Sequence, residues 1–146
     1  MNGEVHYHLT KRWAIEEGFS PEEAERIAAA DWACDAKYVT TLADKRYHWP
    51  IFGSPVVALR RSRAAAATGD LELLGEALHA LQDTLGHGVH GHVWHWPGID
   101  RLEHRSAQFA RRLERRSRAM LAGHRRKRAV VLAAAPAPTH RADGPV

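Results

Sequence analysis

The chain has 146 residues, of which 45% are hydrophobic, as is typical of one globular domain with a single core. One cysteine, Cys34, excludes an intrachain disulfide framework, and there is neither an apolar run long enough to span a membrane nor a secretory signal after Met1. We therefore expect a soluble cytoplasmic protein. Histidine is the unusual component: there are eleven, and five of them lie within the seventeen residues from His79 to His95.

The net charge of +4 conceals two differently charged parts of the chain. Residues 1–100 hold nine Lys or Arg against fourteen Asp or Glu, whereas residues 101–128 hold eleven against two. Any attraction to a polyanion, such as nucleic acid or an anionic membrane, is therefore expected from 101–128 and not from the histidine-rich part. A basic helix face that is simply solvated is the other interpretation of the same residues.

Two helices are expected near the N-terminus. Thr10 is a candidate N-cap for a helix that runs to about Glu17, and Gly18 fits its C-terminal end. A second helix has a stronger start, because Ser20 is followed by Pro21 at the first helical position and by Glu23, which completes a capping box.

The second helix carries two carboxylates on its apolar stripe. Asp31 lies seven residues after Ala24, and Asp35 lies seven residues after Ala28, so both follow the helical repeat of the small apolar residues. A buried carboxylate needs a cation or several hydrogen-bond donors. Both are therefore candidate metal ligands, although an exposed carboxylate would need no such partner.

Pro50, Gly53 and Pro55 predict a loop over 44–55, which carries His48, and a short helix is expected over 56–67. A last helix is expected from about residue 100 to 128, with an apolar stripe that includes Leu102 and Phe109.

We assign residues 1–132 to one helical metal-binding domain and residues 133–146 to a disordered Ala/Pro-rich tail. No strand pattern is present, so the predicted fold class is all-α.

The central helix carries the most informative pattern, His79-x-x-x-Asp83-x-x-x-His87. Residues four apart share one helix face, and His79 and His87 are about 12 Å apart along the axis, too far to bind one ion together. Asp83 lies midway, which suits a carboxylate that bridges two metals. A solvated polar face is the alternative, but Gly75 near the same side favours close packing of another helix there.

Imidazole and carboxylate ligands suit zinc, and also manganese, iron or nickel. The candidate metal-ligand set has members in four separate parts of the chain: His8, Asp35, His48, His79, Asp83 and His87. The region from His90 to His104 is a further source of ligands. No P-loop and no Gly-x-Ser-x-Gly motif is present, so the sequence gives no support to a nucleotide-binding or catalytic-triad interpretation.

The order of these motifs resembles a known family over about residues 5–100. The matching segments are Tyr7-His8-Leu9-Thr10, Gly18-Phe19-Ser20, Ile27-Ala28-Ala29-Ala30 with Asp35, Arg46-Tyr47-His48, and Leu78-His79-Ala80-Leu81-Gln82-Asp83 with His87. They are similar to the zinc-dependent phospholipase C superfamily, which includes single-strand-specific nucleases, and most similar to its short bacterial members.

This resemblance implies an all-helical fold around a three-zinc cluster, and for this chain we expect two or three zinc ions. His8, Asp35, His48, His79 and the bridging Asp83 match ligands, and His87 would begin a third metal site. A zinc-bound hydroxide would attack phosphorus. In our own hypothesis, Asp35 or a nearby metal hydroxide serves as the catalytic base or nucleophile. Family enzymes use a processed N-terminal amine, which His6 would replace here. The family's later His-x-x-x-Glu/Asp pair is missing. Two partial matches to it remain: Asp100-x-x-x-His104, in which the order is reversed, and His92 followed by Asp100.

Two hypotheses of function follow. The first is a zinc-dependent hydrolase of phosphoester bonds, with a phospholipid or single-stranded nucleic acid as the substrate. The second is a non-catalytic, zinc-stabilised helical domain whose basic helix, within residues 101–128, contacts a polyanionic partner. A weaker third idea is a nucleic-acid-binding protein in which the histidines are incidental.

Overall fold

The computed structural model describes residues 3–38, 41, 43–87 and 102–134, and over these ranges the chain is helical with no β-strand. The all-α prediction is therefore confirmed for this part of the chain. In order, the elements are a π-helix η1 (Glu4–Leu9), α1 (Thr10–Glu16), α2 (Pro21–Lys37), 3-10 helices η2 (Asp44–Tyr47) and η3 (Pro50–Phe52), α3 (Ser54–Thr68), α4 (Leu71–His87), η4 (Leu102–His104) and α5 (Ala107–Ala134).

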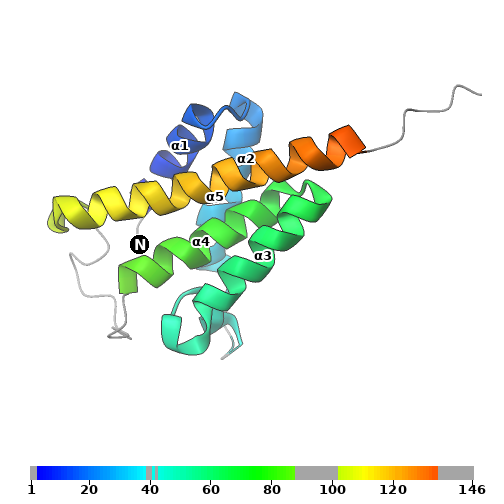
Figure 1. The fold of residues 1–146 in the computed structure, drawn as a ribbon. Helices are drawn as coiled ribbons and strands as arrows, with labels where there is room; N and C mark the ends of the chain where they lie inside the picture. The colour runs from blue at the N-terminus through cyan, green and yellow to red at the C-terminus, as the bar shows by residue number, and fades with distance from the viewer. Residues whose placement is uncertain (1–2, 39–40, 42, 88–101, 135–146) are drawn as a thin grey trace, which may run out of the picture.

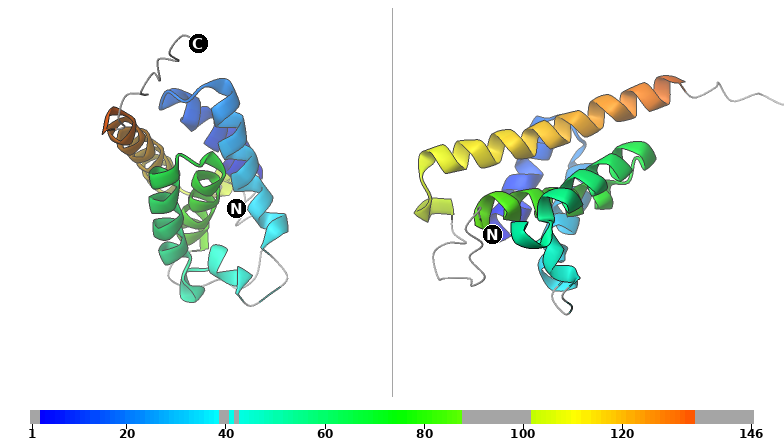
Figure 2. Two further views of the ribbon diagram at one scale, coloured as in Figure 1. Left: turned by 90° about the vertical axis from the view of Figure 1, so that its right-hand side faces the viewer. Right: turned by 60° about the horizontal axis from the view of Figure 1, so that its bottom comes forward.

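Helix α4 is the centre of the bundle. Helix α3 packs along one side of it and α2 crosses another, while the long α5 lies across the bundle and contacts α1, α3 and α4 (Figures 1 and 2). Burial extends around most of α4, including His79, Asp83 and His87. The face that carries these three residues is therefore covered by protein and is not a solvated polar surface.

The N-terminal helices follow the predicted signals, with one correction. Ser20 and Glu23 form the expected capping box, and Gly18 ends the first helical segment with a φ of +85°. Thr10, however, is not an N-cap, because η1 continues directly into α1 at this residue. Its buried hydroxyl lies instead 2.8 Å from Oδ2 of Asp31 on α2.

The expected loop over 44–55 contains the short helices η2 and η3, and α3 begins within it at Ser54. The last helix also differs from its expected bounds. It begins at Ala107, after Ser106 Oγ accepts a hydrogen bond from the backbone N–H of Phe109, and it extends to Ala134. The remainder of the predicted tail, residues 135–146, lies outside the described residues.

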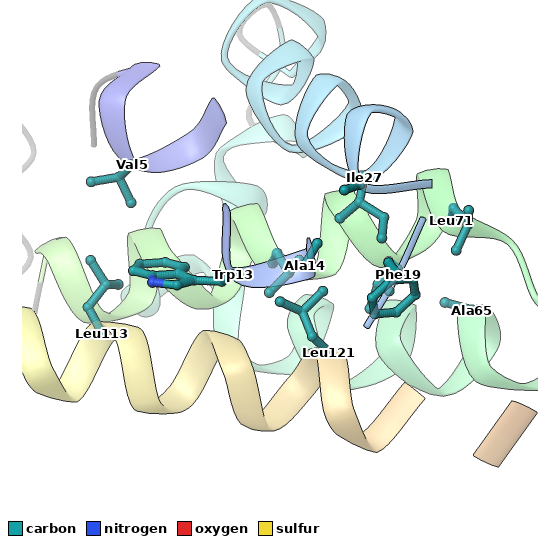
Figure 3. Close-up of a cluster of buried hydrophobic side chains, with 12 residues drawn as sticks. Val5, Trp13, Ala14, Phe19, Ile27, Ala65, Leu71, Leu113 and Leu121 are labelled. Carbon is teal, nitrogen blue, oxygen red and sulfur yellow. The ribbon is translucent and has the colours of Figure 1, made fainter. Parts of the chain in front are cut away.

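The largest apolar cluster joins the N-terminal helices to α5 (Figure 3). Leu113 and Leu121 project from α5 toward Trp13 and Phe19, and all four side chains are buried. Burial of such a side chain contributes about 1.5–3 kcal/mol relative to exposure, so this cluster fixes α5 across the bundle.

The crossing of α2 over α4 requires a glycine. A Cβ added to Gly75 would lie 2.7 Å from Cβ of Ala30 and 2.9 Å from the backbone nitrogen of Asp31, and it would also meet the carbonyl oxygen of Ile27. The expectation of close helix packing at Gly75 is thus confirmed. This close approach is what brings Asp31 to the histidine-bearing face of α4.

Part of the basic charge of α5 is used inside the fold. Arg118 forms ion pairs with Glu16 and Glu17, and Arg128 pairs with Glu23.

None of the described helices combines the length and apolar character needed to cross a bilayer.

Candidate metal centre

Asp83 on α4 is the centre of a buried cluster of imidazoles. Its Oδ1 lies 3.3 Å from Nε2 of His6, and its Oδ2 lies 3.1 Å from Nδ1 of His48. The same Oδ2 lies 3.4 Å from Nε2 of His79 and 3.7 Å from Nε2 of His87. Among the described residues the two carboxylate oxygens therefore face two groups of imidazoles: Oδ1 faces His6 alone, and Oδ2 faces His48, His79 and His87.

His6 is held in one orientation by a buried amide. Nε2 of Gln82 donates a hydrogen bond to the hydroxyl of Thr10 at 2.8 Å, so the other amide atom of Gln82, Oε1, is an acceptor. That oxygen lies 2.8 Å from Nδ1 of His6, which must therefore carry the proton. In the neutral ring the lone pair is then on Nε2, the nitrogen that faces Asp83.

His48 is held in a comparable way by a backbone carbonyl. The oxygen of Tyr38 can only accept, so Nε2 of His48 donates to it across 2.9 Å. The lone pair of neutral His48 is then on Nδ1, which lies 3.1 Å from Oδ2 of Asp83 and 3.0 Å from Nε2 of His79. Lone pairs and a carboxylate converge here, and only protons or a metal cation can occupy the space between them favourably.

The two aspartates of α2 occupy different places in the cluster. Asp31 is fully buried, and its Oδ1 lies 2.9 Å from Nδ1 of His6 and 3.4 Å from Nδ1 of His79. In both histidines Asp31 thus contacts the ring nitrogen that points away from Asp83. Carboxylates in this position orient the imidazoles of metal sites. Asp35 is 36% exposed, and its Oδ1 lies 3.8 Å from Nε2 of His79 on the metal-facing side.

The ligand atoms in the cluster are close enough to one another to bind a common metal ion. Ligand atoms of His6, Asp35, His79 and Asp83 all lie within 4.8 Å of one another. Two ligands of a tetrahedral zinc ion are about 3.4 Å apart, which matches the nitrogen–oxygen separations around Asp83. In the part of the chain that the structure describes, Nε2 of His6 is buried and makes no hydrogen bond. These residues could therefore hold a metal ion.

The charges in the cluster compensate one another. Burial lowers the pKa of His79, but the charge of Asp83 and the contacts with Asp31 outweigh burial and raise it to about 10. Burial and the charge of His79 lower the pKa of His6, and the contact with Asp31 outweighs them and raises it. Burial raises the pKa of Asp83, yet the charge of the N-terminal amine, the charge of His79 and the contacts with His48 and His6 together hold it well below its ordinary value. Without a metal, the buried carboxylates beside His6 and His79 therefore favour the protonated form of these two imidazoles.

The structure brings together most of the predicted ligands, namely Asp35, His48, His79, Asp83 and His87. His8, another predicted ligand, is exposed and is not in the group of described residues whose ligand atoms come together. Residues two apart on a helix point in nearly opposite directions, so His6, and not His8, faces Asp83. His104 is exposed on η4 beside Glu103, and it is not in the group formed by His6, Asp35, His79 and Asp83. His92 and Asp100 lie outside the described residues.

Gln82 and the carbonyl of Tyr38 were not predicted. Gln82 did carry a signal, since it lies four residues after Leu78 on the apolar stripe of α4, where a polar side chain needs a partner. The role of the Tyr38 carbonyl has no sequence signal, because any residue has a carbonyl.

The comparisons identify no family. A scan against protein-family models finds no match, and searches of curated proteins and of solved structures find no similar protein.

Proposed function

We propose that this chain is a metal-dependent hydrolase of phosphoester bonds, with zinc as the metal. The observation that carries the proposal is the arrangement around Asp83: imidazoles from η1, from the turn after η2 and from α4 surround one buried carboxylate at 3.1–3.7 Å. The resemblance to the zinc-dependent phospholipase C superfamily supports the same conclusion.

The residues that would hold the metal ions are His6, Asp35, His48, His79, Asp83 and His87. A divalent cation bound there supplies a Lewis acid that lowers the pKa of water and neutralises charge on phosphate oxygens. Asp83 offers one oxygen to each group of histidines. Gln82, Asp31 and the Tyr38 carbonyl hold the imidazoles in the tautomers that keep their lone pairs directed inward.

Asp35 is the proposed general base. It lies at the exposed side of an otherwise buried cluster, so its carboxylate is within reach of both solvent and the metal-facing nitrogens of His79 and His48. There it would accept the proton of the attacking water and hold the water in line with phosphorus.

The test is hydrolysis by zinc-loaded protein of bis(p-nitrophenyl) phosphate, phosphatidylcholine and single-stranded DNA. Asp35→Asn should lower kcat at least about 100-fold, as expected of a general base. His104→Ala is the matched control outside the cluster and should keep full activity. If fully metallated protein cleaves none of the three substrates, the hydrolase proposal is wrong.

A non-catalytic binding domain is the second candidate. It is favoured by exposed arginines that α5 directs away from the core: Arg111, Arg112, Arg115 and Arg116. In this case metal removal should melt the helices, no phosphoester should be cleaved, and binding to a polyanion should fall steeply with salt. The double variant Arg111→Glu/Arg115→Glu should then abolish that binding and leave metal content unchanged.

A further inference from the structure

Exposed apolar side chains gather at one end of the molecule. The described residues include seven large hydrophobic side chains that are exposed, and four of them lie within nine residues: Ile51, Phe52, Val56 and Leu59, with exposed fractions of 41–59%. Single exposed apolar residues are ordinary, but a contiguous group of them marks an interaction surface. We refer to these four residues, together with Arg46, Arg60 and Arg63, as the η3–α3 face.

The same face is cationic. Residues 43–63 contain five Lys or Arg and one acidic residue, Asp44. Arg61 is engaged inside the fold, where its Nε lies 3.3 Å from the buried carboxylate of Glu76. Arg46, Arg60 and Arg63, by contrast, are exposed. On α3, Val56, Leu59, Arg60 and Arg63 follow helical spacing, so the apolar and the cationic side chains share one side of the helix.

A hollow of about 580 Å³ opens in this face. Its lining is apolar at Phe52 and Val56 and cationic at Arg46 and Arg60. Tyr38 and Tyr47 also line the hollow, and their rings are stacked with 3.7 Å between the centroids. Apolar surface beside arginine is complementary to a molecule that is itself both apolar and anionic.

We propose that the η3–α3 face docks on an anionic lipid surface. Ile51, Phe52 and Val56 would enter the boundary between headgroups and acyl chains, while Arg46 and Arg60 contact lipid phosphates. Exposed Ile, Val and Leu favour lipid over nucleic acid, since aliphatic side chains offer no surface for base stacking. Self-association is disfavoured, because a two-fold interface would bring the arginines of this face against each other.

The placement of this face relates it to the metal centre. His48 lies between η2 and η3, so one short segment supplies both an imidazole of the cluster and the start of the η3–α3 face. This end of the bundle lies away from α5, as Figures 1 and 2 show. Arg63, farther along α3, lines a separate hollow with Arg126 and Lys127 of α5, so the docking is assigned to the end of the face that holds Ile51, Phe52 and Val56. Docking there does not depend on the proposed hydrolase activity.

The experiment is co-sedimentation of the full chain with vesicles of phosphatidylcholine alone or with 30 mol% phosphatidylglycerol. We expect binding to the phosphatidylglycerol vesicles that weakens with salt. Ile51→Ser/Phe52→Ser should reduce partitioning at least about tenfold. Arg46→Glu/Arg60→Glu should remove the preference for anionic lipid. Ile15→Ser is the matched control, since Ile15 is 45% exposed on α1, outside the face, and should bind like the parent chain.

Three results would overturn the inference. The first is that Ile51→Ser/Phe52→Ser and Arg46→Glu/Arg60→Glu both bind vesicles like the parent chain. The second is that vesicle binding is lost only on Arg111→Glu/Arg115→Glu in α5. Sedimentation velocity could instead show a dimer that Ile51→Ser/Phe52→Ser dissociates, which would assign the face to a second copy. Circular dichroism and thermal unfolding establish that each variant is folded. Vesicle binding is measured without turnover, so its outcome is separate from the test of hydrolysis.

Discussion

Nδ1 of His6 lies 2.8 Å from Oε1 of Gln82, although 76 residues separate them in the chain. Both side chains are fully buried, and the direction of the bond is fixed by the second bond of Gln82, to Thr10. The amide on α4 and the carboxylate of Asp31 on α2 both accept at Nδ1 of His6, and together they leave Nε2 as the nitrogen that could bind a metal.

Gln82→Leu should therefore weaken zinc affinity about 10–100-fold, the usual cost of losing an outer partner of a metal-binding histidine. The volume of the side chain is nearly kept, but Nδ1 of His6 loses one of its two acceptors and keeps only Oδ1 of Asp31, 2.9 Å away. A competition titration with a chromophoric chelator measures the affinity, and ¹⁵N NMR of the imidazole reports the tautomer of His6.

Ser117→Ala is the control for this change. Ser117 is buried and lies 3.4 Å from Nε2 of Gln82, but it makes no contact with His6. Its zinc affinity and the tautomer of His6 should match those of the parent chain. Equal losses of affinity in both variants would mean that Gln82 acts only through general stability.

The metal-free protein should lose stability as the pH rises above neutral. The pKa of His79 is raised from 6.5 to about 10 on folding, so its stabilising contribution is complete below pH 6.5 and disappears as the pH rises through 10. The pKa of Asp83 is lowered, so its contribution is complete above its ordinary value of 3.8 and is lost as the pH falls below that value. Stability without metal should be greatest between these limits.

Thermal unfolding in a chelator, followed by circular dichroism, measures this profile. His79→Gln should flatten the alkaline side. With zinc present, the melting temperature should instead rise with pH near neutrality, because deprotonated imidazoles bind the metal and the affinity for zinc therefore rises with pH. A melting temperature that increases from pH 6.5 to 10 without metal would contradict the proposed charge balance.

Gly75→Ala should destabilise the protein by about 1–3 kcal/mol, because the added methyl group meets the backbone of α2 at Ile27 and Asp31. Gly123→Ala on α5 is the matched control, since its nearest neighbour lies 4.0 Å away in the side chain of Arg126. It should stabilise by about 0.5–1 kcal/mol through helix propensity. Urea unfolding compares the two, and equal effects would disprove the close crossing of α2 and α4.

Local signals in the sequence predicted the main helices and one face of the candidate metal centre. The capping box at Ser20 and the apolar repeat of α4 depend on neighbouring residues alone, and so does the common face of His79, Asp83 and His87. These features follow from helix geometry, which the spacing of residues determines.

The remaining features depend on contacts between distant segments. Spacing does not determine whether His6 or His8 faces inward, because that depends on the rotation of η1 against α4. The different places of Asp31 and Asp35 depend likewise on how α2 crosses α4 at Gly75. For the same reason the sequence did not predict the Tyr38 carbonyl as a partner of His48, since the bond arises only when the chain turns back.

The most direct test of the central claim is the zinc content of tag-free protein, measured by plasma mass spectrometry beside Asp83→Asn and His104→Ala. The proposed centre predicts two or three zinc ions per chain in the parent and in His104→Ala, and loss of most of them in Asp83→Asn. Asp83→Asn keeps the size of the side chain but removes the charge that both groups of histidines face. A parent chain that binds no metal, even after refolding with zinc, would contradict the account.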